Sequence, residues 1–132
     1  MGEQRPLVML VDDDPSVTEM YRLGLEMEGF RVSSLNDPQG LGLALDAEIP
    51  DVFVLDWELG SITGGDVLDR LRTDRRTSAK PVFMISNHPE AADEDGRTAR
   101  AGALAWLIKA RTTPDQLAGR LLEVLPPREA SF

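Results

Sequence analysis

The sequence predicts an α/β fold, in which helices cover both faces of a doubly wound parallel sheet. Four apolar runs of four or five residues, each bounded by turn signals, indicate strands buried on both faces: 7–11, 52–55, 82–85 and 104–108. Segments with helical spacing lie between these runs, so that strand and helix alternate five times. Parallel strands joined in this way require right-handed crossovers. The 132 residues suffice for a single domain, with a core at about 7–125.

In the first half of the chain, the same pair of residues predicts the start of two helices: an aspartate followed by proline. Asp14 and Pro15 predict a capped helix that ends near Gly29, with a buried stripe of Val17, Met20, Tyr21 and Gly24. A short second strand is expected at 31–35. Asp37 and Pro38 repeat the signal, and the stripe behind them consists of Leu41, Ala44 and Leu45.

In the second half, the glycines that follow Asp56 predict a flexible loop: Gly60, Gly64 and Gly65. A helix should follow, with Val67, Leu68 and Leu71 on its apolar side. Residues 88–100 should form the fourth helix, but alanine is their only apolar residue type, so we expect this helix to be short, frayed or mobile. Thr113 and Gln116 match a capping box for the last helix, and residues 126–132 form a short tail.

Composition excludes several classes of function. The formal net charge of −9 would repel nucleic acid phosphates and anionic lipids, so we expect no direct binding to nucleic acid or membrane. Without cysteine, and with His88 as the only histidine, the chain lacks the ligands for a thiolate or histidine metal site and the residues for an ordinary catalytic triad. No signal peptide or apolar stretch of membrane length is present, and the cytoplasm is the expected compartment.

Each apolar run is followed by a residue whose side chain can bind a ligand or take part in a reaction. Asp12 and Asp13 follow the first run, and the others are followed by Asp56, Ser86 and Lys109. If the strands are parallel, these residues share one edge of the sheet, where ligands of open α/β sheets bind. Taken singly, each has an ordinary explanation: a turn or helix cap for the aspartates, a loop start for Asp56, a solvated strand end for Lys109. Ser86 alone is uninformative.

The three aspartates would need a cation or raised pKa values. Two unit charges about 4 Å apart repel by roughly 4 kcal/mol at an effective dielectric constant near 20. Magnesium prefers carboxylate oxygens, water and phosphate. With Mg²⁺ and Lys109, the charges of Asp12, Asp13 and Asp56 would sum to zero. The sequence therefore predicts a divalent cation beside a phosphoryl group.

These residues resemble the receiver domain of two-component response regulators, from Leu7 to about Leu125. That family has an acidic pair after the first strand, a phosphorylatable aspartate after the third, Ser or Thr after the fourth and Lys after the fifth. The resemblance implies a flavodoxin-like (βα)5 sheet with strand order 2-1-3-4-5. It also implies that the chain catalyses its own phosphorylation and dephosphorylation without being a conventional turnover enzyme.

By this resemblance, Asp56 accepts a phosphoryl group from a histidine kinase or a histidine phosphotransfer protein in a phosphorelay. Mg²⁺ would be bound by Asp13, Asp56 and the backbone carbonyl of Glu58, with Asp12 acting mainly through water. The phosphoryl oxygens would contact the Lys109 ammonium, the Ser86 hydroxyl and the backbone N–H of Asn87. A downstream protein would bind the face made by the fourth helix, fifth strand and fifth helix, and the chain would be a monomer or a weak dimer.

Two aromatic residues flank these positions. Trp106 stands where the family usually has Tyr or Phe, the aromatic that moves with the Ser or Thr, although it would equally fit a half-buried strand. Trp57 either lines the mouth of the site or is simply exposed.

The sequence departs from the family pattern in three places. Ala110 replaces the proline that usually follows the lysine, so we expect a trans bond, because a cis bond before a residue other than proline costs about 3–4 kcal/mol. Gly60 replaces another proline, and Asn87 replaces a small residue.

Other functions remain open. A receiver fold that works only as a protein-interaction module, with little or no phosphorylation, is the main alternative. A phosphatase of the haloacid dehalogenase type would need a second aspartate where Glu58 stands. A flavodoxin is disfavoured because the first loop is acidic.

Overall fold

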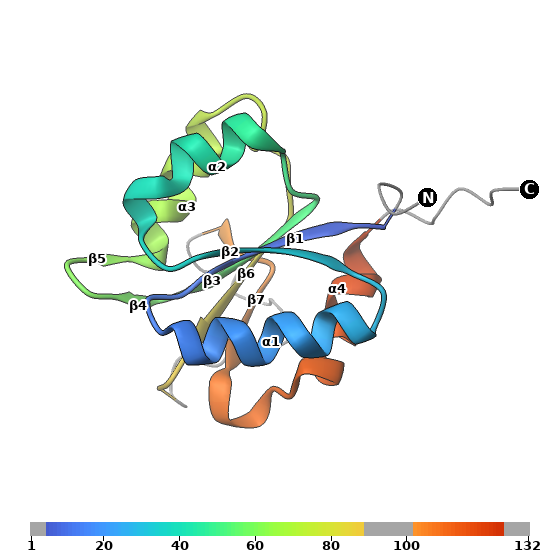
Figure 1. Cartoon of the computed structure of the whole chain (residues 1–132). Coiled ribbons are helices and arrows are strands. Elements are labelled where there is room, and N and C mark those ends of the chain that lie inside the picture. The colour runs from blue at the N-terminus through green and yellow to red at the C-terminus, as the bar shows by residue number, and fades with distance from the viewer. Residues whose placement is uncertain (1–4, 89–101, 126–132) are drawn as a thin grey trace, which may run out of the picture.

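The computed structural model describes residues 5–88 and 102–125, whose centre is a five-stranded parallel sheet (Figure 1). In spatial order its strands are β2 (Arg31–Leu35), β1 (Leu7–Val11), β3 (Val52–Asp56), β6 (Val82–Ser86) and β7 (Ala105–Ile108). All neighbouring pairs are parallel. The fold class and the strand order expected from the sequence are therefore confirmed.

Helices cover both faces of the sheet (Figure 1). α1 (Pro15–Met27) and α4 (Pro114–Val124) lie on one face, and α2 (Leu41–Ala47) and α3 (Gly64–Thr73) lie on the other. The expected helix at 88–100 falls, except for His88, outside the described residues. Among the helices that the structure describes, none has the length and apolar character needed to cross a membrane.

The predicted helix signals operate as expected. The Asp14 side chain accepts a hydrogen bond from the Ser16 N–H at the start of α1, and Thr113 and Gln116 form the capping box of α4. Gly29, which follows α1, has a φ of 95°, a conformation that glycine adopts without strain. The Asp37–Pro38 signal starts a short 3-10 turn, Pro38–Gly40, before α2 begins.

The expected stripe of α1 is partly wrong. Met20 is 48% exposed, whereas the buried side of the helix contains Thr18, Tyr21 and Leu25. Thr18 is buried because its hydroxyl is satisfied, donating to the Pro15 carbonyl and accepting from the Asn36 side-chain amide.

The expectation of a flexible glycine loop after Asp56 is also wrong. The segment forms a two-stranded antiparallel hairpin, β4 (Glu58–Leu59) and β5 (Ile62–Thr63). Gly60 has a φ of 79° at its turn. A Cβ on Gly64 would lie 2.5 Å from the Asp56 carbonyl oxygen, so this glycine allows α3 to begin directly against β3.

Alternation along the strands divides the core into two halves. Even-numbered residues of β1 and β3 pack toward α1 and α4, together with odd-numbered residues of β6 and β7: Val8, Leu10, Val52, Val54, Phe83, Ile85, Ala105 and Leu107. The residues between them pack toward α2 and α3: Met9, Val11, Phe53, Leu55, Val82, Met84 and Trp106. The same alternation determines the face on which each residue at the strand ends lies.

Substitution of two helical glycines, Gly24 in α1 and Gly119 in α4, would test how closely these helices pack. A Cβ on Gly24 would lie 2.2 Å from the Pro114 Cβ, whereas a Cβ on Gly119 would meet no atom within 4 Å. We expect Gly24→Ala to lower the free energy of unfolding by about 1–3 kcal/mol through overpacking. Gly119→Ala, the matched control, should raise it by roughly 0.5–1 kcal/mol through helix propensity. Urea denaturation measures both, and equal effects of the two substitutions would contradict this packing.

Candidate functional site

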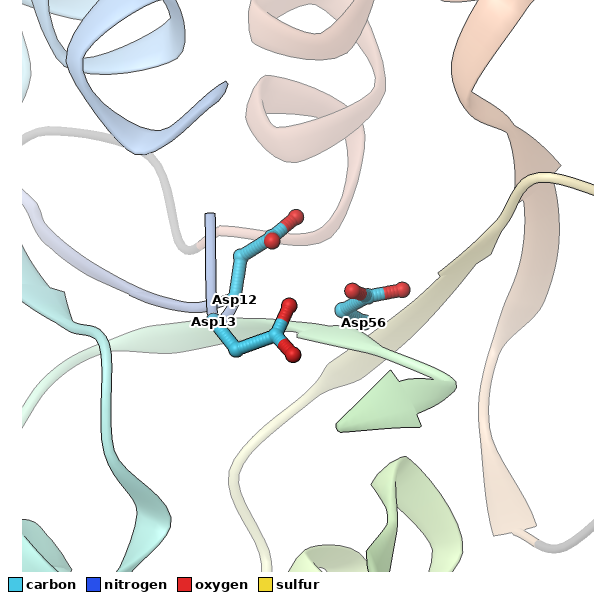
Figure 2. Close-up of side chains that lie close together, drawn as sticks. All are labelled: Asp12, Asp13 and Asp56. Atoms are coloured by element: carbon cyan, nitrogen blue, oxygen red, sulfur yellow. The ribbon is translucent and has the colours of Figure 1, made fainter. Parts of the chain in front are cut away.

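Four of the five side chains expected at the carboxyl edge of the sheet meet there, and the Ser86 hydroxyl contacts Glu58 instead. Asp12 and Asp13 follow β1, Asp56 ends β3, and Lys109 follows β7. One carboxylate oxygen from each of the three aspartates can be chosen so that all lie within 4.8 Å of one another. Figure 2 shows the three carboxylates gathered in one space, with the Asp13 side chain directed toward Asp56. Asp12 and Asp56 are buried, and Asp13 is exposed.

Lys109 lies between two of these aspartates. Its Nζ is 2.7 Å from Asp12 Oδ2 and 3.1 Å from Asp56 Oδ2. The side chains of Asp12 and Asp56 are only 6% and 2% exposed, so both ion pairs are largely shielded from water. Alternation along the strands explains why Lys109, Asp12 and Asp56 meet. It places all three on the face of the sheet that packs against α1 and α4.

Hydrogen bonds hold the loop after Lys109, in which Ala110 follows the lysine. The described residues contain no cis peptide bond, which confirms the trans bond expected before Ala110. The buried Tyr21 hydroxyl donates to the Thr112 carbonyl oxygen at 2.7 Å, and the Thr112 hydroxyl donates to the Ile108 carbonyl oxygen at 2.8 Å. These contacts tie the loop to α1 and to the end of β7.

Backbone donors hold the two buried aspartates in place. Asp12 Oδ1 accepts from the Asp14 N–H at 2.9 Å, and Asp56 Oδ1 accepts from the Glu58 N–H at 3.2 Å. The other oxygen of each carboxylate faces Lys109. Both side chains are therefore fixed before any ligand arrives.

The electrostatics of the cluster favour an added cation. Burial, assisted by repulsion from Asp12, raises the pKa of Asp56 to about 6, although Lys109 opposes the shift. Burial lowers the pKa of Lys109, but its hydrogen bonds to Asp12 and Asp56 outweigh this and raise it. Three carboxylates and one ammonium leave a formal charge of −2. Carboxylate oxygens carrying this charge fit a hard divalent cation such as Mg²⁺.

Ser86 and Asn87 have a partner that the sequence did not predict. The Ser86 hydroxyl donates to Glu58 Oε2 at 3.0 Å, and the Asn87 backbone N–H donates to Glu58 Oε1 at 3.1 Å. We expected Glu58 to act through its backbone carbonyl, and this remains a prediction. The available signal for its side chain was an acidic residue two positions after Asp56.

The two tryptophans pack against each other. Their ring centroids are 4.9 Å apart, and the ring planes are inclined by 46°. Trp106 is 3% exposed, so it is fully rather than half buried, and Trp57 is partly buried rather than exposed. Because Trp57 directly follows Asp56, its fluorescence should report changes at the site.

Comparison with solved structures supports the fold. The chemotaxis response regulator CheY4 of Vibrio cholerae matches with a TM-score of 0.77 and 23% identity, over 92% of this chain and 99% of that chain. A putative response regulator from Chloroflexus aurantiacus J-10-fl matches with a TM-score of 0.76 and 26% identity, over 90% and 96% of the two chains.

Curated relatives are transcriptional regulators that are longer than this chain. The phosphate regulon transcriptional regulatory protein PhoB of Rhizobium meliloti is 29% identical over 113 residues, which are 86% of this chain and 49% of that protein. The alginate biosynthesis transcriptional regulatory protein AlgB of Pseudomonas aeruginosa is 31% identical over 93% of this chain and 27% of its own length. The chain thus spans about half or less of these relatives.

The family model described as the response regulator receiver domain matches residues 8–121, which include the central sheet from the second residue of β1 onward and all the site residues discussed above. The chain therefore belongs to the family of response regulator receiver domains.

Proposed function

We propose that this chain is a phosphoacceptor in a two-component phosphorelay. Asp56 receives a phosphoryl group from a phosphohistidine on a histidine kinase or a histidine phosphotransfer protein. One Asp56 carboxylate oxygen attacks phosphorus while the bond from phosphorus to the imidazole nitrogen breaks. The chain's own residues promote both this step and the later hydrolysis.

The observation that carries the proposal is the position of Lys109 between Asp12 and Asp56, beside Asp13. Phosphoryl transfer depends on positioning and charge neutralisation more than on covalent chemistry. Lys109 supplies a fixed positive charge within 3.1 Å of the proposed nucleophile. When the acceptor aspartate becomes phosphorylated, this ammonium is available to a phosphoryl oxygen.

The donor set supports Mg²⁺ as the cofactor. In our proposal Asp13, Asp56 and the Glu58 backbone carbonyl ligate the ion, and Asp12 contacts it mainly through water. The ion would neutralise charge on the carboxylates and on the incoming phosphoryl oxygens. Asp12 and Asp56 are held by backbone N–H groups, while Asp13 is exposed.

The downstream partner follows from the relatives by analogy. PhoB and AlgB are named as transcriptional regulatory proteins, and this chain spans 49% and 27% of their lengths. We propose that a protein or an attached output segment receives the signal at the face formed by the fourth helix, the fifth strand and the fifth helix. The fifth strand of this face is β7 and the fifth helix is the one labelled α4, and both lie within the described residues.

One observation favours a second candidate, a receiver fold that acts only by binding other proteins. Two donors expected for the phosphoryl group, the Ser86 hydroxyl and the Asn87 N–H, are already engaged by Glu58. Phosphorylation at Asp56 separates the two candidates.

Asp56 should be the phosphoacceptor. With acetyl phosphate and Mg²⁺, intact-mass analysis should show one added phosphoryl group on the wild type and none on Asp56→Asn, which lacks the nucleophilic carboxylate. Asp69→Asn, on the exposed side of α3, makes the same charge change and should label normally. Labelling of Asp56→Asn at another residue would overturn the assignment. A wild type that resists both acetyl phosphate and phosphorylated kinases would favour the second candidate.

The charge cluster should lower stability in the absence of a cation. An aspartate has a pKa near 3.9 when unfolded, whereas Asp56 has a pKa of about 6 in the folded chain. Between these values the folded state binds more protons, so the free energy of unfolding should fall as pH rises from about 4 to about 6. In the part of the chain that the structure describes, the charged groups beside Asp56 are Asp12, Asp13 and Lys109.

Asp56→Asn removes this penalty. Without Mg²⁺ at pH 7.5, its free energy of unfolding should exceed that of the wild type by about 1–2 kcal/mol, a figure reduced because water at the mouth of the site screens the repulsion. Millimolar Mg²⁺ should raise the melting temperature of the wild type more than that of Asp56→Asn, and should change Trp57 fluorescence. Equal responses of both proteins would contradict the proposed metal site.

A further inference from the structure

The donors expected to bind a phosphoryl group already hold an anion from the chain itself. The two oxygens of the Glu58 carboxylate each accept one hydrogen bond, from the Ser86 hydroxyl at 3.0 Å and from the Asn87 N–H at 3.1 Å. Ser86 Oγ also accepts from the His88 N–H at 3.1 Å, so its single proton is directed to Glu58. Both donors thus face a carboxylate, which offers them charged oxygens much as a phosphoryl group would.

The hairpin positions Glu58 for this contact. Glu58 begins β4 and pairs with Thr63 of β5, which fixes its backbone beside the site. Its own N–H donates to Asp56 Oδ1 at 3.2 Å. Glu58 therefore contacts Asp56 through its backbone N–H. Through its side chain it contacts the two donors that would bind the phosphoryl oxygens.

We propose that the Glu58 side chain competes with the phosphoryl group for the same two hydrogen-bond donors, the Ser86 hydroxyl and the Asn87 N–H. In the unphosphorylated chain, its carboxylate occupies Ser86 and Asn87. A phosphoryl group on Asp56 must displace that carboxylate to gain both donors, and its added negative charge also repels Glu58. Glu58 thereby sets how readily the phosphorylated state forms and couples the hairpin to it. This inference rests on the proposed function, because it requires an anion beside Asp56.

The size of the effect follows from occupancy. If the donors are free in a fraction of molecules, the apparent affinity for a phosphoryl analogue is reduced by that fraction. A contact that leaves them free about one tenth of the time weakens binding about tenfold. Glu58→Ala should therefore tighten binding of beryllofluoride, with Mg²⁺ present, by about tenfold in a tryptophan fluorescence titration.

Matched variants separate the contact from its charge. Glu58→Asp keeps the charge but shortens the side chain by one methylene, so it should also tighten binding. Glu58→Gln removes the charge and keeps one acceptor oxygen, so it should fall between the wild type and Glu58→Ala. Asp69→Asn should leave the affinity unchanged. If Glu58→Asp bound like the wild type while Glu58→Gln bound like Glu58→Ala, simple charge repulsion would replace our inference.

A second measurement needs neither metal nor analogue. The amide proton resonance of Asn87 should shift upfield in Glu58→Ala and Glu58→Asp, which lose its acceptor, and not in Asp69→Asn. No shift in either Glu58 variant would overturn the inference even if Asp56 accepts phosphate normally. If wild type and Glu58→Ala both failed to bind beryllofluoride, the proposed function would fall together with the inference. Binding by Glu58→Ala alone would support it.

Discussion

The site depends on the ion pairs that Lys109 makes with Asp12 and Asp56. Two carboxylates that are 6% and 2% exposed would repel each other strongly if no cation lay between them. The ammonium offsets part of that repulsion and leaves a formal charge of −2 on the group that includes Asp13. The fold therefore holds a site that is stable enough to form and still short of positive charge. In our proposal, one divalent cation brings this formal charge to zero.

Much of this arrangement could be predicted from the sequence because strand geometry determines it. Parallel strands bring their carboxyl ends to one edge, which brings Asp12, Asp56 and Lys109 together across three strands. Alternation along each strand would also have placed these three on the face of α1 and α4, away from the α2 and α3 side that holds Met84 and Trp106. The family pattern of an acidic pair, an aspartate and a lysine is therefore a pattern of strand ends.

The remaining features of the fold and the site depend on contacts that leave no periodic pattern in the sequence. Gly60 suggested flexibility, but its φ of 79° closes the hairpin of β4 and β5, and that hairpin positions Glu58. The hydrogen bond from Ser86 to Glu58 joins residues 28 positions apart, from strands in different sheets. Met20 had the right spacing for the core, but Thr18 is buried there because Pro15 and Asn36 satisfy its hydroxyl. Local patterns predict faces, while long-range hydrogen bonds decide which polar groups occupy them.

We propose that Asp12, Asp13 and Asp56 form one specific cation site rather than part of a diffuse acidic surface. Mn²⁺ is a paramagnetic substitute that accepts the same oxygen ligands as Mg²⁺. Titration of Mn²⁺ into the isotopically labelled protein should first broaden the amide resonances of residues 12–14, 56–58, 86–87 and 109, and excess Mg²⁺ should restore them. Asp13→Asn should weaken the effect. Broadening spread over a chain with a net charge of −9, without preference for these residues, would contradict the account.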